Sequence, residues 1–296
     1  MVELRKRLED SRPILADGAM GTFLSQLGND SSICPENLNL SNPRALHEVA
    51  KAYHSAGAEI LQTNTFGGSP IRLREYDLDS KTKEINRVAV ESVRNIVGTS
   101  AYITGSIGPC GQHLLPFGDL DPESFKESCR LQMSALVEGG VDAFSIETVM
   151  DVEEAVLALQ VAREAAPHVV RIVSAAFLKN PNGFFTSFGN SLRETVQRFY
   201  DEGAEVVGAN CGEGMTGMID IARELRCICT LPLIIRPNAG LPEVDNGITV
   251  WNEAPGEFAG GVKELLDVGI KIIGGCCGTT PEHIRKAKSV IDEHQH

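Results

Sequence analysis

Short apolar runs alternate with longer amphipathic stretches along the whole chain. The apolar runs are rich in aliphatic and β-branched residues, which is typical of buried strands. They predict strands over residues 13–17, 59–64, 102–107, 143–147, 171–177, 206–210, 231–237 and 271–275. Between them, apolar residues spaced three and four positions apart predict helices, for example over 125–138, 152–164 and 258–267.

A repeated glycine pattern indicates how these elements are arranged. Gly57, Gly140, Gly203 and Gly269 each stand a few residues before an even-numbered strand. We call this repeat, which recurs once every two strand–helix units, the glycine echo. It favours a ring of strand–helix units over an open sheet. We therefore expect an α/β fold, a single-domain (β/α)8 TIM barrel over residues 1–296. A doubly wound sheet is the alternative, but no Gly-x-Gly-x-x-Gly follows the first strand.

Charge and cysteine content narrow the class of protein. The net charge of −13 disfavours nucleic acid or an anionic membrane as a partner. The charged start "MVELRKRLEDS" lacks an apolar signal segment, and no run approaches the roughly 20 apolar residues of a membrane span. The eight cysteines then predict reduced thiols, some of them metal-bound, rather than a disulfide framework. We expect a soluble, cytoplasmic protein.

Polar residues and cysteines stand where the predicted strands end. In a barrel of this class, the carboxyl ends of the strands carry the active site. The residues concerned are Asp17, Asn64, Glu147, Cys211, Asn238 and the pair Cys276-Cys277, with Cys110 after the third strand. Taken alone, such an aspartate could be a turn former, such a glutamate a satisfied buried carboxylate, and the glycines near the pair a phosphate cradle.

Three cysteines of this set predict a metal site. Three thiolates can occupy three corners of a tetrahedral zinc and leave the fourth open, as in a catalytic site. Adjacent cysteines can both serve only if the chain turns sharply, and Gly274, Gly275 and Gly278 give it that freedom. Simple packing and a vicinal disulfide are the alternatives. Cys227 and Cys229 lie between a helix end and a strand, so we expect them at the opposite end of the barrel in a structural role.

Several motifs together resemble the homocysteine S-methyltransferase family, especially the homocysteine-binding barrel of its cobalamin-dependent methionine synthases. They are "DGAMGT" (17–22), "TNTFGG" (63–68), "GSIGPCG" (105–111), "IET" (146–148), "GANCG" (208–212), "RPNAG" (236–240) and "GGCCGTTPEHI" (274–284). The resemblance covers nearly the whole chain and implies methylation of homocysteine to methionine with Zn2+ held by Cys211, Cys276 and Cys277. Three thiolates leave such a site negatively charged, and a fourth should make the bound acceptor sulfur electron-rich.

The resemblance also implies how the acceptor amino acid is held. Its amino group would lie against two carboxylates, its carboxylate against backbone amides, and two asparagines would shape the pocket. The two carboxylates are Asp17 and Glu147. The backbone amides are those of Gly18, Ala19 and Gly21, and the two asparagines are Asn64 and Asn238.

The methyl donor is left open between two classes: a methyl-corrinoid on a separate protein, which the resemblance favours, and a sulfonium compound. Gly67 stands where the betaine-using branch has a tyrosine, which disfavours betaine. The family's large enzymes continue into further modules, so this chain is either a stand-alone enzyme or part of a longer one. Cys110 and Arg236 receive no predicted role. The alternative functions are methyl transfer to another thiol, a zinc Lewis-acid lyase or aldolase, and a zinc-storage or redox-sensing barrel.

Overall fold

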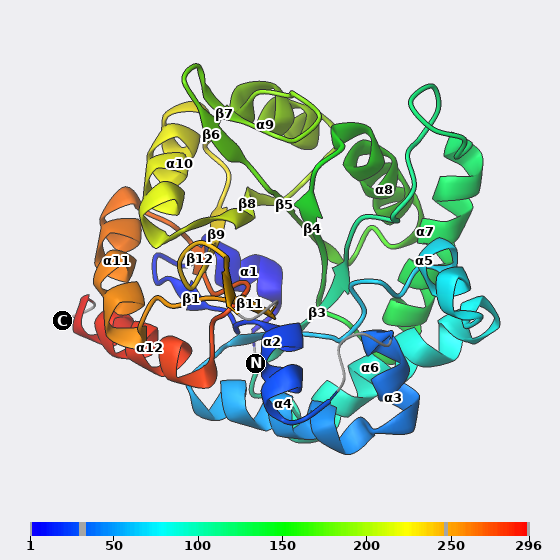
Figure 1. The fold of residues 1–296 in the computed structure, drawn as a ribbon, viewed down its shortest axis with the longest axis horizontal. Coiled ribbons are helices and arrows are strands. Elements are labelled where there is room, and N and C mark those ends of the chain that lie inside the picture. The colour runs from blue at the N-terminus through cyan, green and yellow to red at the C-terminus, as the bar shows by residue number, and fades with distance from the viewer. Residues whose placement is uncertain (1, 30–33, 246–247, 295–296) are drawn as a thin grey trace.

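The parallel strands of the structure, a computed structural model that describes residues 2–29, 34–245 and 248–294, form a closed barrel (Figure 1). They are β1 (Ile14–Leu15), β2 (Ile60–Gln62), β3 (Tyr102–Ile107), β4 (Ala143–Val149), β5 (Val170–Ala175), β8 (Val206–Gly214), β9 (Leu233–Asn238) and β12 (Ile272–Ile273). They pair in the order β1-β12-β9-β8-β5-β4-β3-β2, and a bridge between Ala16 and Ile60 joins β1 to β2. Each predicted strand is therefore confirmed, and the doubly wound alternative is wrong.

A ring of helices surrounds the barrel. Its members are α4 (Pro43–Ser55), α6 (Thr82–Val97), α7 (Pro122–Gly139), α8 (Val152–Ala165), α9 (Leu192–Asp201), α10 (Met215–Ile228), α11 (Pro255–Val268) and α12 (Pro281–His294). The three predicted helices lie within α7, α8 and α11. The four glycines of the echo all have positive φ, as expected where a helix ends before a strand. In the described part of the chain, no helix is both long and apolar enough to span a membrane.

Smaller elements extend the loops at both ends of the barrel. They are α1 (Leu4–Glu9), α2 (Met20–Gln26), α3 (Leu38–Ser41), α5 (Pro70–Leu73), the 3-10 turns η1 (Pro35–Asn37), η2 (Arg74–Tyr76) and η3 (Asp79–Lys81), and the hairpins β6 (Leu178–Asn180) with β7 (Gly183–Phe185) and β10 (Glu243–Asp245) with β11 (Ile248–Val250). The sequence pattern predicted none of these, because a strand of three residues is too short to show a period.

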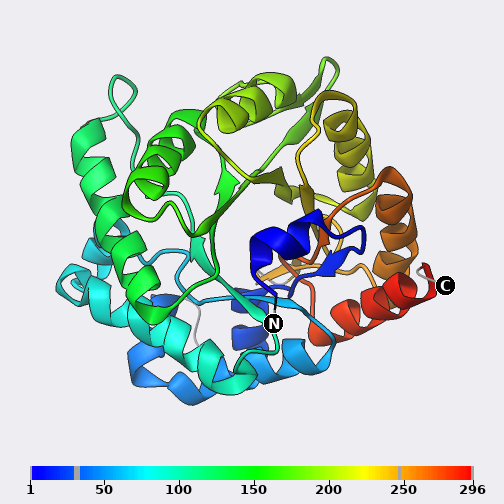
Figure 2. The same cartoon turned by 180° about the vertical axis from the view of Figure 1, so that it is seen from behind.

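The inside of the barrel changes from apolar to polar along its axis. At the amino end, α1 crosses the opening (Figure 2), and its Leu4 and Leu8 join an apolar cluster of inward-facing strand residues. Side chains two positions along a strand point the same way, so Ile60 is followed inward by Gln62 and Ile234 by Arg236. The polar layer therefore lies at the carboxyl end, which is where an active site of this fold is built.

Candidate active site at the carboxyl end of the barrel

The structure brings Cys211, Cys276 and Cys277 together, with their sulfur atoms all within 4.8 Å of one another. Zinc–sulfur bonds of about 2.3 Å in a tetrahedral site place sulfur atoms about 3.8 Å apart. The cluster thus has the size for one metal ion. Among the residues that the structure describes, this is the group of metal-ligating side chains with such spacing, and Cys110 is not part of it.

The adjacent cysteines lie in a turn beyond the end of β12, not in a strand. The backbone N–H of Cys276 donates to the Pro237 carbonyl (2.7 Å), and the Cys277 carbonyl accepts from Ala239 N–H (2.9 Å). Both residues are thereby fixed to the end of β9. Gly278 follows with φ +80°, a conformation that glycine adopts without strain. This turn lets both thiols reach one metal position, as the flanking glycines predicted.

Cys211 in β8 and Thr148 in β4 share an unusual backbone conformation, each where the pairing register of its strand shifts. Their φ angles are +59° and +56°, which costs a non-glycine residue about 1–3 kcal/mol. Asn210 links the two strands: its Oδ1 accepts from Thr148 N–H (2.8 Å) and Ser174 Oγ (2.7 Å), and its Nδ2 donates to Thr148 Oγ1 (2.8 Å). Thr148 and Asn210 stand at predicted strand ends in the sequence but received no predicted role, and Ser174 was not noted. Hydrogen bonds between such distant residues leave no signal in the sequence.

The three thiols differ in acidity, because hydrogen bonds among them shift their pKa values in opposite directions. Hydrogen bonds from Cys276 and Cys277 lower the pKa of the Cys211 thiol, and one from the Asn238 side chain lowers it further. The pKa values of Cys276 and Cys277 are raised, mainly by their hydrogen bonds to Cys211. Asn238 thus contacts the cysteine cluster, and its own buried Oδ1 has no partner in the described part of the chain. The cluster favours a negative charge at Cys211.

A cavity of about 310 Å³ opens beside the cysteine cluster. Its lining includes all three cysteines, together with Gly18, Ala19, Met20, Gly21, Thr22, Pro35, Glu36, Gln62, Asn64, Phe66, Ser106, Glu147, Thr148 and Arg236. Most of the predicted site residues therefore meet in one place. Asp17 and Asn238 are not among the lining residues.

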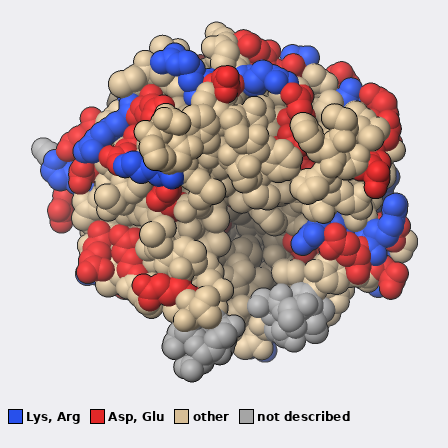
Figure 3. Space-filling view, turned by 45° about the horizontal axis from the view of Figure 1, so that its top comes forward, with Lys and Arg blue, Asp and Glu red and all other residues tan. Residues whose placement is uncertain are grey.

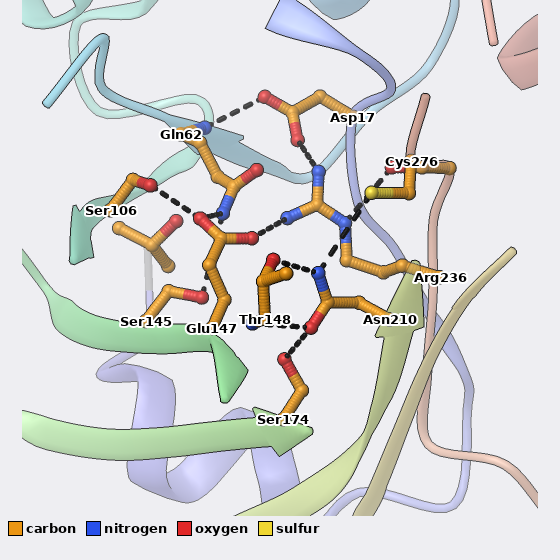
Figure 4. Close-up of polar contacts among 12 residues, drawn as sticks. Asp17, Gln62, Ser106, Ser145, Glu147, Thr148, Ser174, Asn210, Arg236 and Cys276 are labelled. Carbon is orange, nitrogen blue, oxygen red and sulfur yellow. Dashed lines mark hydrogen bonds and ion pairs between the residues drawn. The ribbon is translucent and has the colours of Figure 1, made fainter. Parts of the chain in front are cut away.

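Charged groups at the floor of the cavity form one network (Figure 4). Arg236 Nη2 donates to Asp17 Oδ1 (2.9 Å), Arg236 Nη1 lies 3.5 Å from Glu147 Oε2, and Arg236 Nε donates to the Gly275 carbonyl (3.1 Å). Glu147 Oε1 also accepts from Gln62 Nε2 (2.6 Å) and from the Ser106 hydroxyl. Burial raises the pKa of Asp17 to about 6 and also raises that of Glu147, while Arg236 opposes both shifts.

The remaining predicted residues shape the loops around the cavity. Asn64 Nδ2 donates to the Pro35 carbonyl (2.7 Å) and to Asn39 Oδ1 (3.0 Å), which fixes the loop over the cavity. The Ala19 N–H donates a hydrogen bond to Thr279 Oγ1 (3.0 Å), so one of the amides predicted to bind the acceptor's carboxylate already has a partner. Gly18 packs closely here, since an added Cβ would lie 2.7 Å from that same oxygen.

Glu36 was missed in the sequence, although it is buried and lines the cavity. Its Oε1 accepts from Gly67 N–H (2.6 Å), and a Cβ at Gly67 would lie 3.0 Å from that oxygen. A side chain at position 67 would therefore press on Glu36, so the position is suited to glycine in this chain.

Cys110 belongs to a second buried group beside α8. Its Sγ donates to Glu154 Oε1 (2.9 Å). The charge of Asp151 raises the pKa of Glu154, and burial together with Glu154 raises the pKa of the neighbouring Cys129. Burial raises the pKa of Glu154 to about 7, and the Cys110 hydrogen bond offsets this only in part. Burial likewise raises the pKa of Cys110 to about 12, so this thiol stays protonated at neutral pH.

The raised pKa of Glu154 predicts a pH-dependent effect of Glu154→Gln. Because the folded-state pKa lies above the ordinary value of 4.5, ionisation opposes folding as pH rises from about 4.5 through about 7. The variant avoids this cost, so it should be about 1–3 kcal/mol more stable than the unaltered protein at pH 8. Urea unfolding at pH 4 and at pH 8 measures the free energy of unfolding of both proteins. A gain in stability at pH 4 as large as the gain at pH 8 would contradict the explanation.

Cys227 and Cys229 lie at the carboxyl end of α10, just before β9. This is the amino end of the barrel, opposite the cavity. The prediction that they stand apart from the metal cluster is confirmed.

Comparison with known proteins places this geometry in a family. A model of the homocysteine S-methyltransferase family matches residues 14–291. The chain is 28% identical to the methionine synthase of Mycobacterium leprae (strain TN) and 27% identical to that of Mycobacterium tuberculosis (strain ATCC 25618 / H37Rv), over 294 residues in each case. These alignments cover 95% of this chain but 24% and 25% of the relatives, so the chain spans about a quarter of their length.

Solved structures share the barrel. The metallated form of the Escherichia coli homocysteine methyltransferase MmuM superposes with a TM-score of 0.81 at 24% identity, covering 97% of this chain and 99% of that one. Its oxidized form gives a TM-score of 0.80 at 24% identity, with 98% and 99% covered. This likeness concerns the fold, whereas the family model also covers the motifs that carry the cavity. The chain belongs to the homocysteine S-methyltransferase family.

Proposed function

We propose that this barrel transfers a methyl group to the thiol of homocysteine, giving methionine, at a zinc ion held by Cys211, Cys276 and Cys277. The observation that carries the proposal is that one cavity holds the three sulfur atoms together with a buried carboxylate and a buried guanidinium. An amino-acid thiol has a matching group for each: a thiol for a metal at the cysteines, an ammonium group for the carboxylate and a carboxylate for the guanidinium. Membership in the homocysteine S-methyltransferase family supports the same acceptor.

The cysteine cluster fits zinc in donor type as well as in size. Soft thiolate ligands favour zinc over magnesium or calcium, and three protein ligands leave one position for a substrate. A bound zinc ion would supply the positive charge that lets an acceptor thiol lose its proton near neutral pH. The strand ends contribute the rigidity: Asn210, next to Cys211 in the chain, is hydrogen-bonded to Thr148 and Ser174, and the contacts to the end of β9 hold the adjacent pair.

The acceptor's amino group is proposed to bind Glu147. This carboxylate lines the cavity, and Gln62 and Ser106 orient its Oε1. Asp17, which the resemblance assigned to the same role, lies outside the cavity lining and is proposed to act through Arg236. Gly18 and Gly21 remain candidates for the acceptor's carboxylate through their amides, as does the cavity-lining Asn64 for pocket shape.

The methyl donor is proposed to be a methyl-corrinoid bound to a separate protein that docks over the cavity. Large apolar side chains are exposed on the connections that follow the carboxyl ends of barrel strands, and one of them, Phe66, lines the cavity. They are Phe66, Leu115, Phe117, Met150, Leu178, Phe188, Leu241 and Val244. Among the described residues, Figure 3 shows mostly uncharged surface next to the hollow, with most Lys, Arg, Asp and Glu side chains farther out. Such a surface suits a docking protein better than a small hydrophilic donor. A sulfonium compound is the second donor to test.

The proposal is tested on the cobalt-substituted protein. We expect thiolate-to-cobalt charge-transfer bands that shift when L-homocysteine is added, with methionine and cysteine as controls. Cobalt bands that respond equally to all three amino acids would contradict homocysteine as the acceptor, and the absence of thiolate bands would overturn the ligand set. Methylcobalamin, S-methylmethionine and S-adenosylmethionine, offered in turn to the zinc form, then distinguish the donor classes.

A further inference from the structure

Arg236 occupies a position that the sequence left without a role. Its side chain comes from the inward face of β9, is 4% exposed, and lines the cavity next to Glu147. Asp17 is 2% exposed and does not line the cavity. Figure 4 shows the guanidinium between the two carboxylates. Arg236 thus separates Asp17 from the cavity. The charged side chains in the lining are Arg236, Glu147 and Glu36, and Glu36 is already held by the Gly67 N–H, so Glu147 and Arg236 form the charged pair open to an acceptor.

The two ion pairs of Arg236 are unequal. Its Nη2–Asp17 Oδ1 distance of 2.9 Å is a hydrogen bond, whereas Nη1 and Glu147 Oε2 are 3.5 Å apart. Asp17 therefore acts as the anchor that compensates the buried guanidinium. Glu147 keeps its negative charge available for a cation from the cavity. A guanidinium has five N–H donors, and the contacts to Asp17, Gly275 and Glu147 engage three of them.

The backbone supplies only part of a carboxylate site. The Ala19 N–H, in the stretch where amides would receive the acceptor's carboxylate, is donated to Thr279 Oγ1. The absence of a side chain at Gly274, just beyond the neighbouring strand β12, leaves space here, since an added Cβ would lie 3.3 Å from Arg236 Nε and 2.9 Å from the Asp17 carbonyl oxygen. The chain thus makes room for a buried cation where the amide cradle is incomplete.

We propose that Arg236 is a specificity-determining residue that binds the carboxylate of the acceptor, with Asp17 as its anchor, while Glu147 binds the ammonium group. The Glu147–Arg236 pair then recognises a zwitterion, so the preferred acceptors are α-amino-acid thiols rather than simple aminothiols or mercapto acids. A planar guanidinium suits a carboxylate because it can donate two N–H groups to it. This inference rests on the proposed function of the cavity.

Two truncated acceptors separate the two charges. 3-Aminopropane-1-thiol is homocysteine without its carboxylate, and 4-mercaptobutyrate is homocysteine without its ammonium group. Dissociation constants for these and L-homocysteine are measured from the charge-transfer bands of the cobalt-substituted protein. The variants are Arg236→Met, which removes the cation at similar length, Arg236→Lys, which keeps the charge without the fork, and Glu147→Gln as the matched control.

The unaltered protein should prefer homocysteine to each analogue by about 30-fold or more, because a buried charge loses its partner in either case. In Arg236→Met, the preference over the aminothiol should fall to within about threefold, and the preference over the mercapto acid should persist. Glu147→Gln should show the reverse. Arg236→Lys should retain part of the carboxylate preference, and it serves as the decisive variant if Arg236→Met does not fold or bind cobalt.

Two outcomes would overturn the inference. An unchanged preference for homocysteine over the aminothiol in Arg236→Met, or in Arg236→Lys when only that variant folds, assigns the carboxylate to the backbone amides. Equal loss of both preferences makes Arg236 a general structural support. An unaltered protein whose thiolate bands ignore homocysteine is a different result, because it contradicts the proposed function itself.

Discussion

Cys276→Ala is expected to remove the metal and the methyl transfer while leaving the barrel folded. The substitution takes away one of three sulfur atoms that lie within 4.8 Å of one another. Activity should fall by more than about a hundredfold, since changes even in the residues around metal ligands cost 10–100-fold. Zinc content after dialysis, the rate of methionine formation and the circular dichroism spectrum measure the three effects. Cys277→Ala should behave in the same way.

The matched control is Cys227→Ala, which changes an exposed cysteine at the opposite end of the barrel. It should keep zinc content and activity. Full activity in either Cys276→Ala or Cys277→Ala would overturn the ligand assignment, whereas loss of zinc in Cys227→Ala would mean that zinc content reports general damage.

Gly208→Ala is expected to prevent stable folding. Gly208 on β8 pairs with Ile234 on β9, and an added Cβ would lie 1.7 Å from the Ile234 carbonyl oxygen. No flexible side chain can relieve this clash, because the contacted atom is backbone in the neighbouring strand. The two strands must separate, so we expect a loss of more than about 4 kcal/mol in the free energy of unfolding. Asn210 and Cys211 follow directly, so zinc binding should fail with the fold.

Gly260→Ala provides the control for this substitution. Gly260 is an exposed residue within α11, and an added Cβ meets nothing within 4 Å. Alanine should raise the free energy of unfolding by about 0.5–1 kcal/mol, because glycine is the poorer helix former. Thermal melting compares the two variants. A Gly208→Ala protein that melts within a few degrees of the unaltered chain would show that β8 and β9 can adjust their spacing.

The barrel was predictable because its signals are local. Each parallel strand is buried on both faces and reads as a continuous apolar run. The four glycines of the echo take positive φ where a helix ends, which is a requirement of the backbone itself. The position of Cys211, Cys276 and Cys277 at strand ends followed from the fold, since the carboxyl ends of parallel strands meet at one rim. The short helix α1, whose Leu4 and Leu8 close the amino end, was not predictable, because the partners of these leucines come from many strands.

The sequence by itself thus determined the barrel, the glycine-assisted turn and the three converging thiols, all of which depend on residue type and spacing. Only the tertiary structure decided the charges around the acceptor. Arg236 and Asp17 are 219 residues apart, and their pairing depends on β1 and β9 both flanking β12. Likewise, Asn210 next to Cys211 is hydrogen-bonded to Thr148, 62 residues away, and this contact joins the two sites of positive φ. Contacts between distant buried groups depend on the closed barrel, and a linear pattern does not contain them.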